Sequence, residues 1–357
     1  MPILKINIVL PFPVTKPGGG AKIMYEYANR LFEKGHDIYI YHSIKRPFKK
    51  SKTPVWIKQL IFFFRNVARP KWFPLHKNIV CKIVPEITDS HIRNADIILS
   101  TWWQMTYAVS ALNNLKGKKF NLIQGHEIWV GHEEAVLNSY KLPINHLVIS
   151  KYLQILVEKK SCKSPVYLPN ALNTDEFFDK KNHGLRDAFT LIMLFSNEPI
   201  KGTEYGLQAL ELVHKKYPQL KVILFGVFLQ PENLPSYITY YQNPENLNLL
   251  YNTASIFFSP SNGEGWALPP AEAMACGCAV VCTEIGGHLD YAVDGKSALL
   301  VQPKDINNMS EKILSLLTNT TLRNLIAQNG HQLITTSFSW DKSTKKLEDC
   351  LYNSLKD

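Results

Sequence analysis

The chain has 357 residues, of which 45% are hydrophobic and 20% are charged. This length is too great for one ordinary hydrophobic core and suits two domains of about 150 to 200 residues each. No stretch approaches the ~18 uninterrupted apolar residues that a membrane-spanning helix needs. The N-terminus shows no signal-peptide cleavage pattern and is expected to form a first β-strand. These features exclude a membrane-spanning protein and predict a soluble two-domain protein of the cytoplasm.

The formal net charge of +10 comes from one segment of the chain. From Ile38 through Pro85 there are eleven Lys or Arg residues and no Asp or Glu, which leaves 40 − 11 = 29 basic against 30 acidic residues elsewhere. Between Lys45 and Lys77 the charges alternate with aromatic residues, namely Trp56, Phe62, Phe63, Phe64, Trp72 and Phe73. This combination predicts a binding partner for the segment.

The first half of the chain alternates strand-like apolar runs with helix-like patterns. The predicted strands cover residues 5–10, 37–42, 95–100, 121–125 and 146–150. A helix is predicted over residues 24–35, where Gly35 ends it. This alternation is typical of a parallel sheet with crossover helices.

A second series of the same kind follows a polar stretch around residues 174–186, which is the predicted linker. Its predicted strands cover residues 190–196, 220–226, 255–260, 278–283 and 297–301, and a helix is predicted over 203–217. The last segment, from Phe338, has the apolar spacing of a helix. The sequence thus predicts two α/β domains and a terminal helix.

A glycine-rich turn, Gly18-Gly19-Gly20, follows the first predicted strand. Glycines let a backbone approach a phosphate closely, and a helix N-terminus attracts anions. Such turns are common, however, and this one lacks the spacing of a P-loop. An ordinary turn and a phosphate-binding loop are both open at this point.

The most specific motif runs from Ser259 to Val281 and combines a strand end, a turn and a helix with proline in its first turn. Glu264 and Glu272 are separated by seven residues, with the first on the loop and the second in the helix. A loop carboxylate can bind sugar hydroxyls, a helix carboxylate can bind a ribose diol, and the helix amides can hold phosphates. The spacing alone also fits two glutamates on a solvated helix face, but the flanking GEGW and EAMACG favour the binding site.

This segment resembles the E-x7-E signature of the retaining GT-B glycosyltransferases of family 4, of bacterial type. Other family-like elements occur in the family's order: the glycine loop, the histidine of IQGHEIW, the phrase YLPNALNTDEF, the lysine of PIKGTEYGL and GGHLDYAVDGKSALLV. The resemblance covers nearly the whole chain. It implies an α/β fold with GT-B architecture, in which two Rossmann-like domains face each other across a cleft.

In this family the N-terminal domain binds the acceptor and the C-terminal domain binds the nucleotide-sugar donor. The resemblance assigns these roles to residues 1–173 and 174–337 respectively. It also implies that the helix at about 338–357 packs back on the N-terminal domain.

The resemblance further implies catalytic roles for His126, Lys201 and Glu264. Glu264 would bind hydroxyls of the donor sugar, Lys201 would pair with the pyrophosphate, and His126 would lie near the transferring carbon. Taken alone, Lys201 also fits an ordinary helix-end lysine and His126 a core histidine. The donor-binding set that the resemblance implies is Gly18, Gly19, Gly20, Lys201, Tyr241, Gln242, Glu264, Gly265, Trp266, Ala267, Leu268 and Glu272.

Within this set, Gly265, Trp266 and Ala267 would face the sugar, and Glu272 would bind the ribose. Tyr241 and Gln242 would lie near the nucleobase.

The sequence departs from the family pattern in three places. Many relatives carry an arginine where this chain has Phe195, so the phosphate site lacks a second fixed cation. Ala171 replaces a usual glycine and Ala279 a usual proline; both differences look structural. The missing arginine keeps open the alternative of a catalytically silent partner subunit.

The family implies transfer of a hexose-type sugar from a nucleotide diphosphate sugar to a hydroxyl of a glycan or lipid-linked acceptor, in bacterial cell-surface polysaccharide synthesis. It implies retention of configuration. The sequence contains no Asp-x-Asp motif to hold a divalent ion, so we expect a metal-independent enzyme with no cofactor. Lys201, the amides near Ala267 and Leu268, and a helix dipole would stabilise the leaving phosphate.

The segment from Lys45 to Lys77 is expected to dock the N-terminal domain on an anionic membrane surface. The protein would then be cytoplasmic and peripheral on the inner face of the plasma membrane. Alternatives are a solvated loop whose aromatics pack into the domain, and direct binding of an acidic polysaccharide. A nucleic-acid-binding protein also fits the charge, but the charge is confined to an insertion in an otherwise enzyme-like domain.

Overall fold

The computed structural model describes residues 2–50, 53–128, 131–161, 163–180 and 185–356. The chain divides into two compact units, the first formed by Met1–Asn170 with Asp341–Asp357 and the second by Ala171–Trp340. Residues 51–52 of the basic segment and 181–184 of the predicted linker lie outside the described residues.

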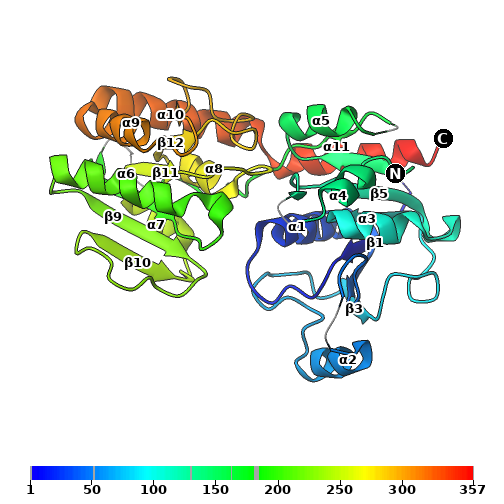
Figure 1. The fold of residues 1–357 in the computed structure, drawn as a ribbon. Coiled ribbons are helices and arrows are strands. Elements are labelled where there is room, and N and C mark those ends of the chain that lie inside the picture. Colours follow the sequence, from blue (N-terminus) through cyan, green and yellow to red (C-terminus); the bar gives the residue numbers. More distant parts are fainter. Residues whose placement is uncertain (1, 51–52, 129–130, 162, 181–184, 357) are drawn as a thin grey trace. The chain divides into compact units, whose positions relative to one another are not determined.

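In the described part of the chain, unit 1 contains a seven-stranded sheet in the order β3-β2-β1-β4-β5-β6-β7 (Figure 1). Its strands are β1 (Lys5–Leu10), β2 (Asp37–Ser43), β3 (Val80–Val84), β4 (Ile97–Thr101), β5 (Lys118–Ile123), β6 (Asn145–Val148) and β7 (Val166–Tyr167). Its helices are α1 (Gly19–Glu33), α2 (Val55–Phe64), α3 (Trp103–Ser110), η1 (Asn114–Lys116), α4 (Glu133–Ser139), α5 (Lys151–Glu158) and nearly all of α11 (Trp340–Ser354). The paired strands are all parallel; in the centre, Ile8 of β1 lies between Ile40 of β2 and Leu99 of β4.

Unit 2 repeats the architecture with a six-stranded parallel sheet in the order β10-β9-β8-β11-β12-β13, again in the described residues. Its strands are β8 (Thr190–Leu194), β9 (Lys221–Gly226), β10 (Ile238–Gln242), β11 (Ile256–Ser259), β12 (Ala279–Thr283) and β13 (Leu299–Val301). Its helices are η4 (Pro199–Lys201), α6 (Thr203–Lys216), α7 (Leu247–Thr253), α8 (Leu268–Ala275), α9 (Ile306–Thr318) and α10 (Thr320–Ser337). The prediction of two Rossmann-like α/β domains is confirmed.

The central strands are rich in apolar residues that are buried on both faces of the sheet, as a covered parallel sheet requires. All five residues of β4 and all five of β12 are buried. Several helices begin at a residue whose side chain accepts a backbone N–H. Ser150 caps α5, Asp305 caps α9 and Asn319 caps α10. At the end of α1, Gly35 takes a φ of +94°, which favours glycine.

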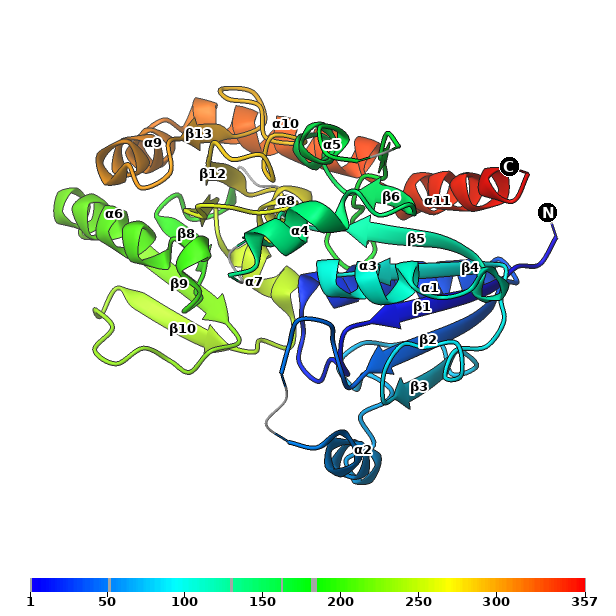
Figure 2. The same ribbon diagram turned by 45° about the vertical axis from the view of Figure 1, so that its right-hand side comes forward.

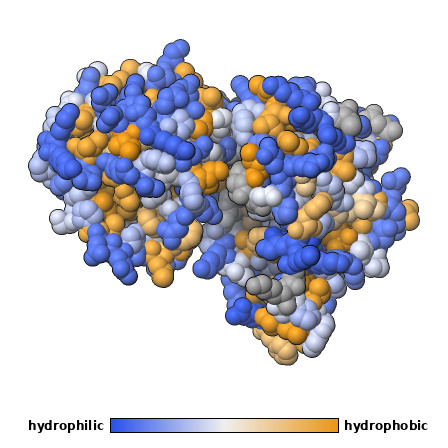
Figure 3. All heavy atoms as spheres, viewed as in Figure 1, coloured by the Kyte–Doolittle hydropathy of each residue, from blue (hydrophilic) through white to orange (hydrophobic). Residues whose placement is uncertain are grey.

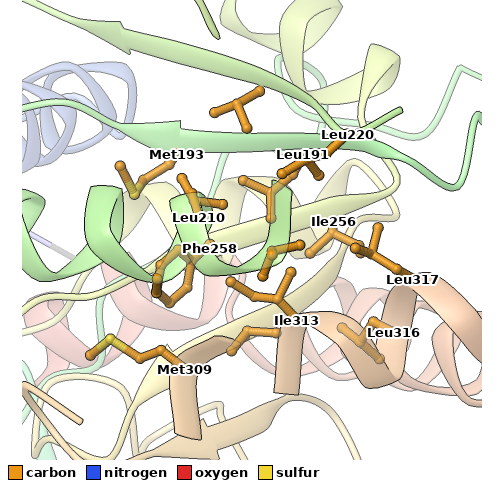
Figure 4. Close-up of a cluster of buried hydrophobic side chains, with 14 of the residues drawn as sticks. Leu191, Met193, Leu210, Leu220, Ile256, Phe258, Met309, Ile313, Leu316 and Leu317 are labelled. Carbon is orange, nitrogen blue, oxygen red and sulfur yellow. The ribbon is translucent and has the colours of Figure 1, made fainter. Parts of the chain in front are cut away.

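The core of unit 2 shows how helix and sheet patterns meet (Figure 4). Leu191 and Met193 of β8 and Phe258 of β11 point toward the helices, where they meet Leu210 of α6 and Ile313 of α9. All five side chains are completely buried. Their removal from water is the main stabilising contribution of this layer.

The order of strands reverses between β1 and β4 in unit 1 and between β8 and β11 in unit 2. From β8 the chain moves to one side, through α6 to β9, and from β11 it moves to the other, through α8 to β12. Right-handed crossovers therefore carry α6 and α8 to opposite faces of the sheet. The loops that leave β8 and β11 separate at this point, which is where doubly wound sheets bind ligands.

The terminal helix α11 packs within unit 1. Leu347 and Leu351 are completely buried, and Glu348 bonds Lys34 at 2.9 Å and the His36 ring at 3.1 Å. The Ser343 hydroxyl donates to the Pro169 carbonyl at 2.8 Å. The chain thus returns to its first unit after completing the second.

Helix α2 differs from the other helices of unit 1 because none of its residues is buried. In both ribbon views it lies beyond β3, away from the sheet (Figure 2). Among the described residues, no helix has the length and hydropathy needed to cross a membrane.

Candidate functional site

The carboxyl ends of β8 and β11 bring Lys201 and Glu264 together. Lys201 ends the turn η4 after β8, and Glu264 lies on the loop between β11 and α8. The Lys201 Nζ contacts both carboxylate oxygens of Glu264, at 2.8 and 2.9 Å, and the Ser261 hydroxyl donates to the same carboxylate at 3.0 Å. Both side chains are largely buried, with 24% and 14% exposure. They line a small hollow with Ser259 and Pro269.

Backbone contacts hold these two loops against each other. The Asn262 N–H donates to the Ile200 carbonyl at 2.7 Å, and its side chain donates to the Pro199 carbonyl at 3.1 Å. Gly202 has a φ of +63°, and a Cβ there would collide with the Pro260 carbonyl oxygen. Glycine is therefore required at this position for both its conformation and its size.

Gly287 packs closely against the backbone of Glu264. A Cβ on Gly287 would collide with the backbone of Glu264. The adjacent His288 is completely buried, with its Nδ1 2.7 Å from the Thr283 carbonyl and its Nε2 3.4 Å from the Ser259 hydroxyl. Because a carbonyl only accepts, Nδ1 carries the proton. Burial lowers the pKa of His288 and keeps the ring neutral.

Glu272 lies in α8 and is buried, with 6% exposure. The hydroxyl of the completely buried Tyr251, from α7, donates to its carboxylate at 3.0 Å. Burial, followed by the neighbouring Glu272, raises the pKa of Tyr251 well above its usual value, so the phenol remains a donor. Helix α7 thereby fixes the orientation of the Glu272 carboxylate.

The residues just before α8 are packed into unit 2. The Trp266 ring is 5% exposed and lies against Tyr291 and Phe338, at centroid distances of 4.8 and 5.5 Å. The Ala267 N–H donates to the Gly287 carbonyl at 3.3 Å, and its carbonyl accepts from the Tyr291 hydroxyl at 2.8 Å. Gly265 is buried as well. Helix α8 begins at Leu268 without a side-chain cap, so its positive end is not neutralised by a capping oxygen.

Tyr241 and Gln242 lie at the carboxyl end of β10, an outer strand of the sheet, two strands from β8. The Tyr241 side chain is 43% exposed. Phe195, at the position where the family resemblance implies an arginine, is 8% exposed and packs edge-on against Tyr240 at 5.5 Å. An apolar ring thus occupies the position directly after β8.

In unit 1 the three glycines stand at the start of α1: Gly19 and Gly20 are its first two residues, and Gly18 directly precedes them. Gly18 is the extended residue before the helix, with φ −157°, and no side chain caps α1. A Cβ on Gly18 would have nothing within 4 Å. The Gln124 side chain, from the end of β5, donates to the Gly20 carbonyl at 3.0 Å. This bond joins the glycine turn to the loop that carries His126.

His126 lies three residues after β5, and its Nδ1 is 3.1 Å from the Tyr140 hydroxyl. Burial lowers the pKa of His126, so the neutral ring dominates near neutral pH.

The next residue, Glu127, is 9% exposed and accepts the Trp103 N–H at 3.0 Å. Burial raises its pKa to about 7. Trp102, which precedes Trp103 in the sequence, has a φ of +76°. Trp102 and Trp103 line a hollow with Gln124, Glu127 and Tyr140.

Two groups of predicted site residues thus emerge, one on each unit. Lys201, Glu264, Gly265, Trp266, Ala267, Leu268 and Glu272 lie around the loop between β11 and α8, whereas Tyr241 and Gln242 lie at the edge of the sheet. The sequence motifs did not identify Ser261, Tyr251 and His288 in unit 2, or Gln124 and Glu127 in unit 1, as residues that contact or lie near the predicted site residues or line the hollows. Within the described ranges, no group of His, Cys, Asp and Glu side chains could hold a metal ion.

Comparisons with known proteins place this geometry in context. Residues 175–333 match the family described as "Glycosyl transferases group 1". The capsular polysaccharide biosynthesis glycosyltransferase CapM of Staphylococcus aureus is 26% identical over 196 residues, which cover 52% of this chain and 51% of CapM. The chain spans about half or less of the length of the curated relatives that it matches first.

Two solved structures resemble nearly the whole chain. Anabaena HepE, in complex with UDP and glucose, has a TM-score of 0.73 at 15% identity and covers 98% of this chain and 99% of its own. A mutant of Staphylococcus aureus TarM, in complex with fondaparinux, alpha-GlcNAc-glycerol and UDP, has a TM-score of 0.72 at 13% identity and covers 98% of this chain and 100% of its own. At these identities the likeness concerns the fold, which is the GT-B type with two Rossmann-like domains.

Proposed function

We propose that this chain is a retaining glycosyltransferase of family 4. It moves a hexose-type sugar from a nucleotide diphosphate sugar to a hydroxyl of a glycan or lipid-linked acceptor in bacterial cell-surface polysaccharide synthesis. The family match of residues 175–333 supports the reaction class. The role in polysaccharide synthesis is supported by CapM, whose name refers to capsular polysaccharide. HepE and TarM, which share the fold, were both crystallised with UDP.

The observation that carries this proposal is the contact between Lys201 and Glu264 at the carboxyl ends of β8 and β11. A lysine ammonium has three donors, and two of them reach Glu264. The third can donate to a phosphate without breaking the pair. The Glu264 carboxylate has lone pairs beyond those that Lys201 and Ser261 use, so it can also accept sugar hydroxyls. One cation and one carboxylate can therefore hold the two sides of the donor's scissile bond.

We assign the remaining donor contacts to further residues of unit 2. Glu272, oriented by Tyr251, binds the ribose diol. The uncapped N-terminus of α8 at Leu268 stabilises the pyrophosphate. Gly265, Trp266 and Ala267 are assigned to the border of the sugar site; the Trp266 ring is packed inside the unit, and the Ala267 N–H and carbonyl are hydrogen-bonded within it. Tyr241 and Gln242 are assigned to the nucleobase.

Unit 1 supplies the acceptor side in this proposal. The uncapped start of α1 lets Gly18, Gly19 and Gly20 approach the donor phosphates. His126 lies near the transferring carbon. Its neutral ring can accept or donate one hydrogen bond, which suits a group that positions the reacting atoms.

Retention requires the acceptor hydroxyl to attack the face of the sugar from which the nucleoside diphosphate departs. We assign the removal of the acceptor proton to an oxygen of the leaving phosphate, with His126 as a positioning group. Negative charge grows on that phosphate as the bond breaks. Lys201 and the dipole of α8 stabilise it, so the reaction needs no divalent ion and no cofactor.

The proposal includes a membrane partner. The segment from Lys45 to Lys77 holds unit 1 on an anionic membrane surface, where a lipid-linked acceptor would be presented. The protein would then act in the cytoplasm, at the inner face of the plasma membrane.

A panel of nucleotides and nucleotide sugars tests the donor site by thermal shift. A ligand at 100 times its dissociation constant should stabilise the protein by about 2.7 kcal/mol. Glu272→Gln should weaken the effect of every nucleotide that stabilises the wild type, whereas Glu284→Gln, an exposed substitution elsewhere in unit 2, should not. If no nucleotide stabilises the wild type, the donor site is wrong.

A second outcome separates an enzyme from a catalytically silent partner subunit. Phe195 leaves the site one cation short of the family pattern, which favours this alternative. If a nucleotide sugar binds but is never turned over with any acceptor, the silent subunit is the correct function.

A further inference from the structure

The outward face of α2 is apolar, the reverse of an ordinary surface helix. Trp56, Leu60, Phe63 and Phe64 are spaced i, i+4, i+7 and i+8, so they share one face. Their exposed fractions are 64%, 49%, 76% and 82%. The one charged residue of the helix, Lys58, is half-buried. We call these four residues the α2 apolar face.

Other aromatics of the same segment are packed into the domain. Phe73 is 7% exposed and lies 5.5 Å from the Tyr25 ring, and Trp72 donates its indole N–H to the Val14 carbonyl at 2.9 Å. The expectation of aromatics tucked into the domain therefore holds for these two residues and fails for the α2 apolar face. In the space-filling view, hydrophobic atoms gather at the place that α2 occupies in Figure 1 (Figure 3).

Five cations of the same segment have no acidic partner among the described residues. Lys49, Lys50, Arg65, Lys71 and Lys77 are exposed, and no ion pair joins them to a described residue. Two other cations of the segment, Lys45 and Arg69, bind groups within unit 1. Lys45 pairs with Glu86 at 3.0 Å, and the Arg69 guanidinium donates to four backbone carbonyls between residues 75 and 79. The five unpaired cations are available to an external anion.

We propose that α2 inserts its apolar face into the headgroup layer of an anionic lipid bilayer, while the five cations bind lipid phosphates. This deepens the membrane part of the proposed function and rests on it for the claim that the acceptor lies at the membrane. Ten residues of helix are about 15 Å long, too short to span the hydrocarbon core but sufficient to lie in the interface.

Charge favours a bilayer over the other partners that could cover this face. A second copy of the chain would place the same five cations against each other, which is repulsive. An acidic polysaccharide would satisfy the cations but leave Phe63 and Phe64 in water. A bilayer supplies both anionic headgroups and an apolar layer beneath them.

Vesicle sedimentation tests the proposal without donor, acceptor or turnover, so its failure is distinct from failure of the transferase proposal. The purified chain is mixed with vesicles of phosphatidylcholine alone or with added phosphatidylglycerol. The wild type should sediment with the anionic vesicles, and high salt should weaken this binding. Phe63→Ser combined with Phe64→Ser should raise the lipid concentration for half binding at least about tenfold. The matched control, Leu115→Ser with Ile155→Ser, removes two residues that are 67% and 59% exposed elsewhere in unit 1 and should change it less than about twofold.

A charge pair gives an independent comparison. Lys49→Glu with Lys50→Glu should weaken binding to anionic vesicles by about tenfold, whereas Lys159→Glu with Lys160→Glu, exposed residues near α5, should not, although the net charge changes equally. Lipids brominated on the acyl chain should quench part of the tryptophan fluorescence, and Trp56→Phe should abolish that part.

Three results would overturn the inference. The wild type would ignore anionic vesicles at low salt, or the Phe63→Ser and Phe64→Ser variant would bind them as well as the wild type does. In the third, the chain would form a dimer in solution that this variant dissociates, which would assign the face to a second copy.

Discussion

Replacing Glu127 by glutamine should remove a loss of folding stability that the wild type suffers as the pH rises. The carboxyl group is 9% exposed, and burial raises its pKa to about 7 against an ordinary value of 4.5. The Trp103 N–H donates to Oε2 at 3.0 Å and partly opposes this shift. A glutamine side-chain oxygen can accept the same N–H, so Glu127→Gln removes the ionisation with little change in shape.

The magnitude follows from the two pKa values. Well below pH 4.5 the carboxyl is protonated in both the folded and unfolded chain, and stability does not depend on it. As the pH rises, the unfolded chain ionises first, so the free energy of unfolding falls until the folded carboxyl ionises near pH 7. With 1.36 kcal/mol per pKa unit, the loss between pH 5 and pH 8 is about 2 to 3 kcal/mol. Glu127→Gln should escape this loss.

Urea unfolding at pH 5 and pH 8 measures the effect. The variant should gain about 2 to 3 kcal/mol over the wild type as the pH rises between these values, while titration of other groups cancels in the comparison. Glu134→Gln, on the exposed surface of the adjacent α4, serves as the control and should show no gain. If the wild type and Glu127→Gln lose equal stability between the two pH values, the burial argument is refuted.

Two further predictions concern the donor-binding unit. Gly202→Ala should lower the free energy of unfolding by about 2 to 4 kcal/mol, because it adds a collision with Pro260 to the cost of a positive φ. Gly295→Ala, also at positive φ but with open space around the Cβ, should cost only about 1 kcal/mol in the same urea titration, and equal losses would contradict the close approach. Transfer activity should survive EDTA, since Lys201 and the start of α8 are assigned the charge of the leaving phosphate; a loss of activity that Mg²⁺ or Mn²⁺ restores would count against that assignment.

The fold class could be predicted because its signal is local and repeated. The strands predicted at residues 95–100 and 278–283 became the fully buried strands β4 and β12, and Gly35 follows the end of α1. Short outer strands were harder to predict from the sequence. Neither β7, with two residues, nor β10, which is mostly exposed, has the uninterrupted apolar run that marks a covered strand.

Site residues could be predicted only where they belong to a sequence motif. Glu264 and Glu272 share one short segment, but Lys201 meets Glu264 across 63 positions because β8 and β11 are neighbours. Tyr251 and Glu127 carry no such signal: each is a single polar residue whose partner comes from a distant element.

Helix α2 shows the same limit for a surface. Composition predicted a cationic, aromatic segment, yet Trp72 and Phe63 look alike in sequence. Only the fold separates them, because Trp72 reaches Val14 and Tyr25, whereas Phe63 lies on the exposed face of α2, a helix with no buried residue.

Transfer kinetics of variants at Lys201 and Glu264 test the central claim most directly. With the nucleotide sugar that stabilises the wild type and a lipid-linked or glycan acceptor, Lys201→Ala and Glu264→Ala should each lower kcat/KM by about 10² or more, since both groups are assigned to the transition state. Lys221→Ala, which removes an exposed ion pair with Asp187 in the same unit, is the control and should retain activity. Wild-type turnover by both Lys201→Ala and Glu264→Ala would contradict the account.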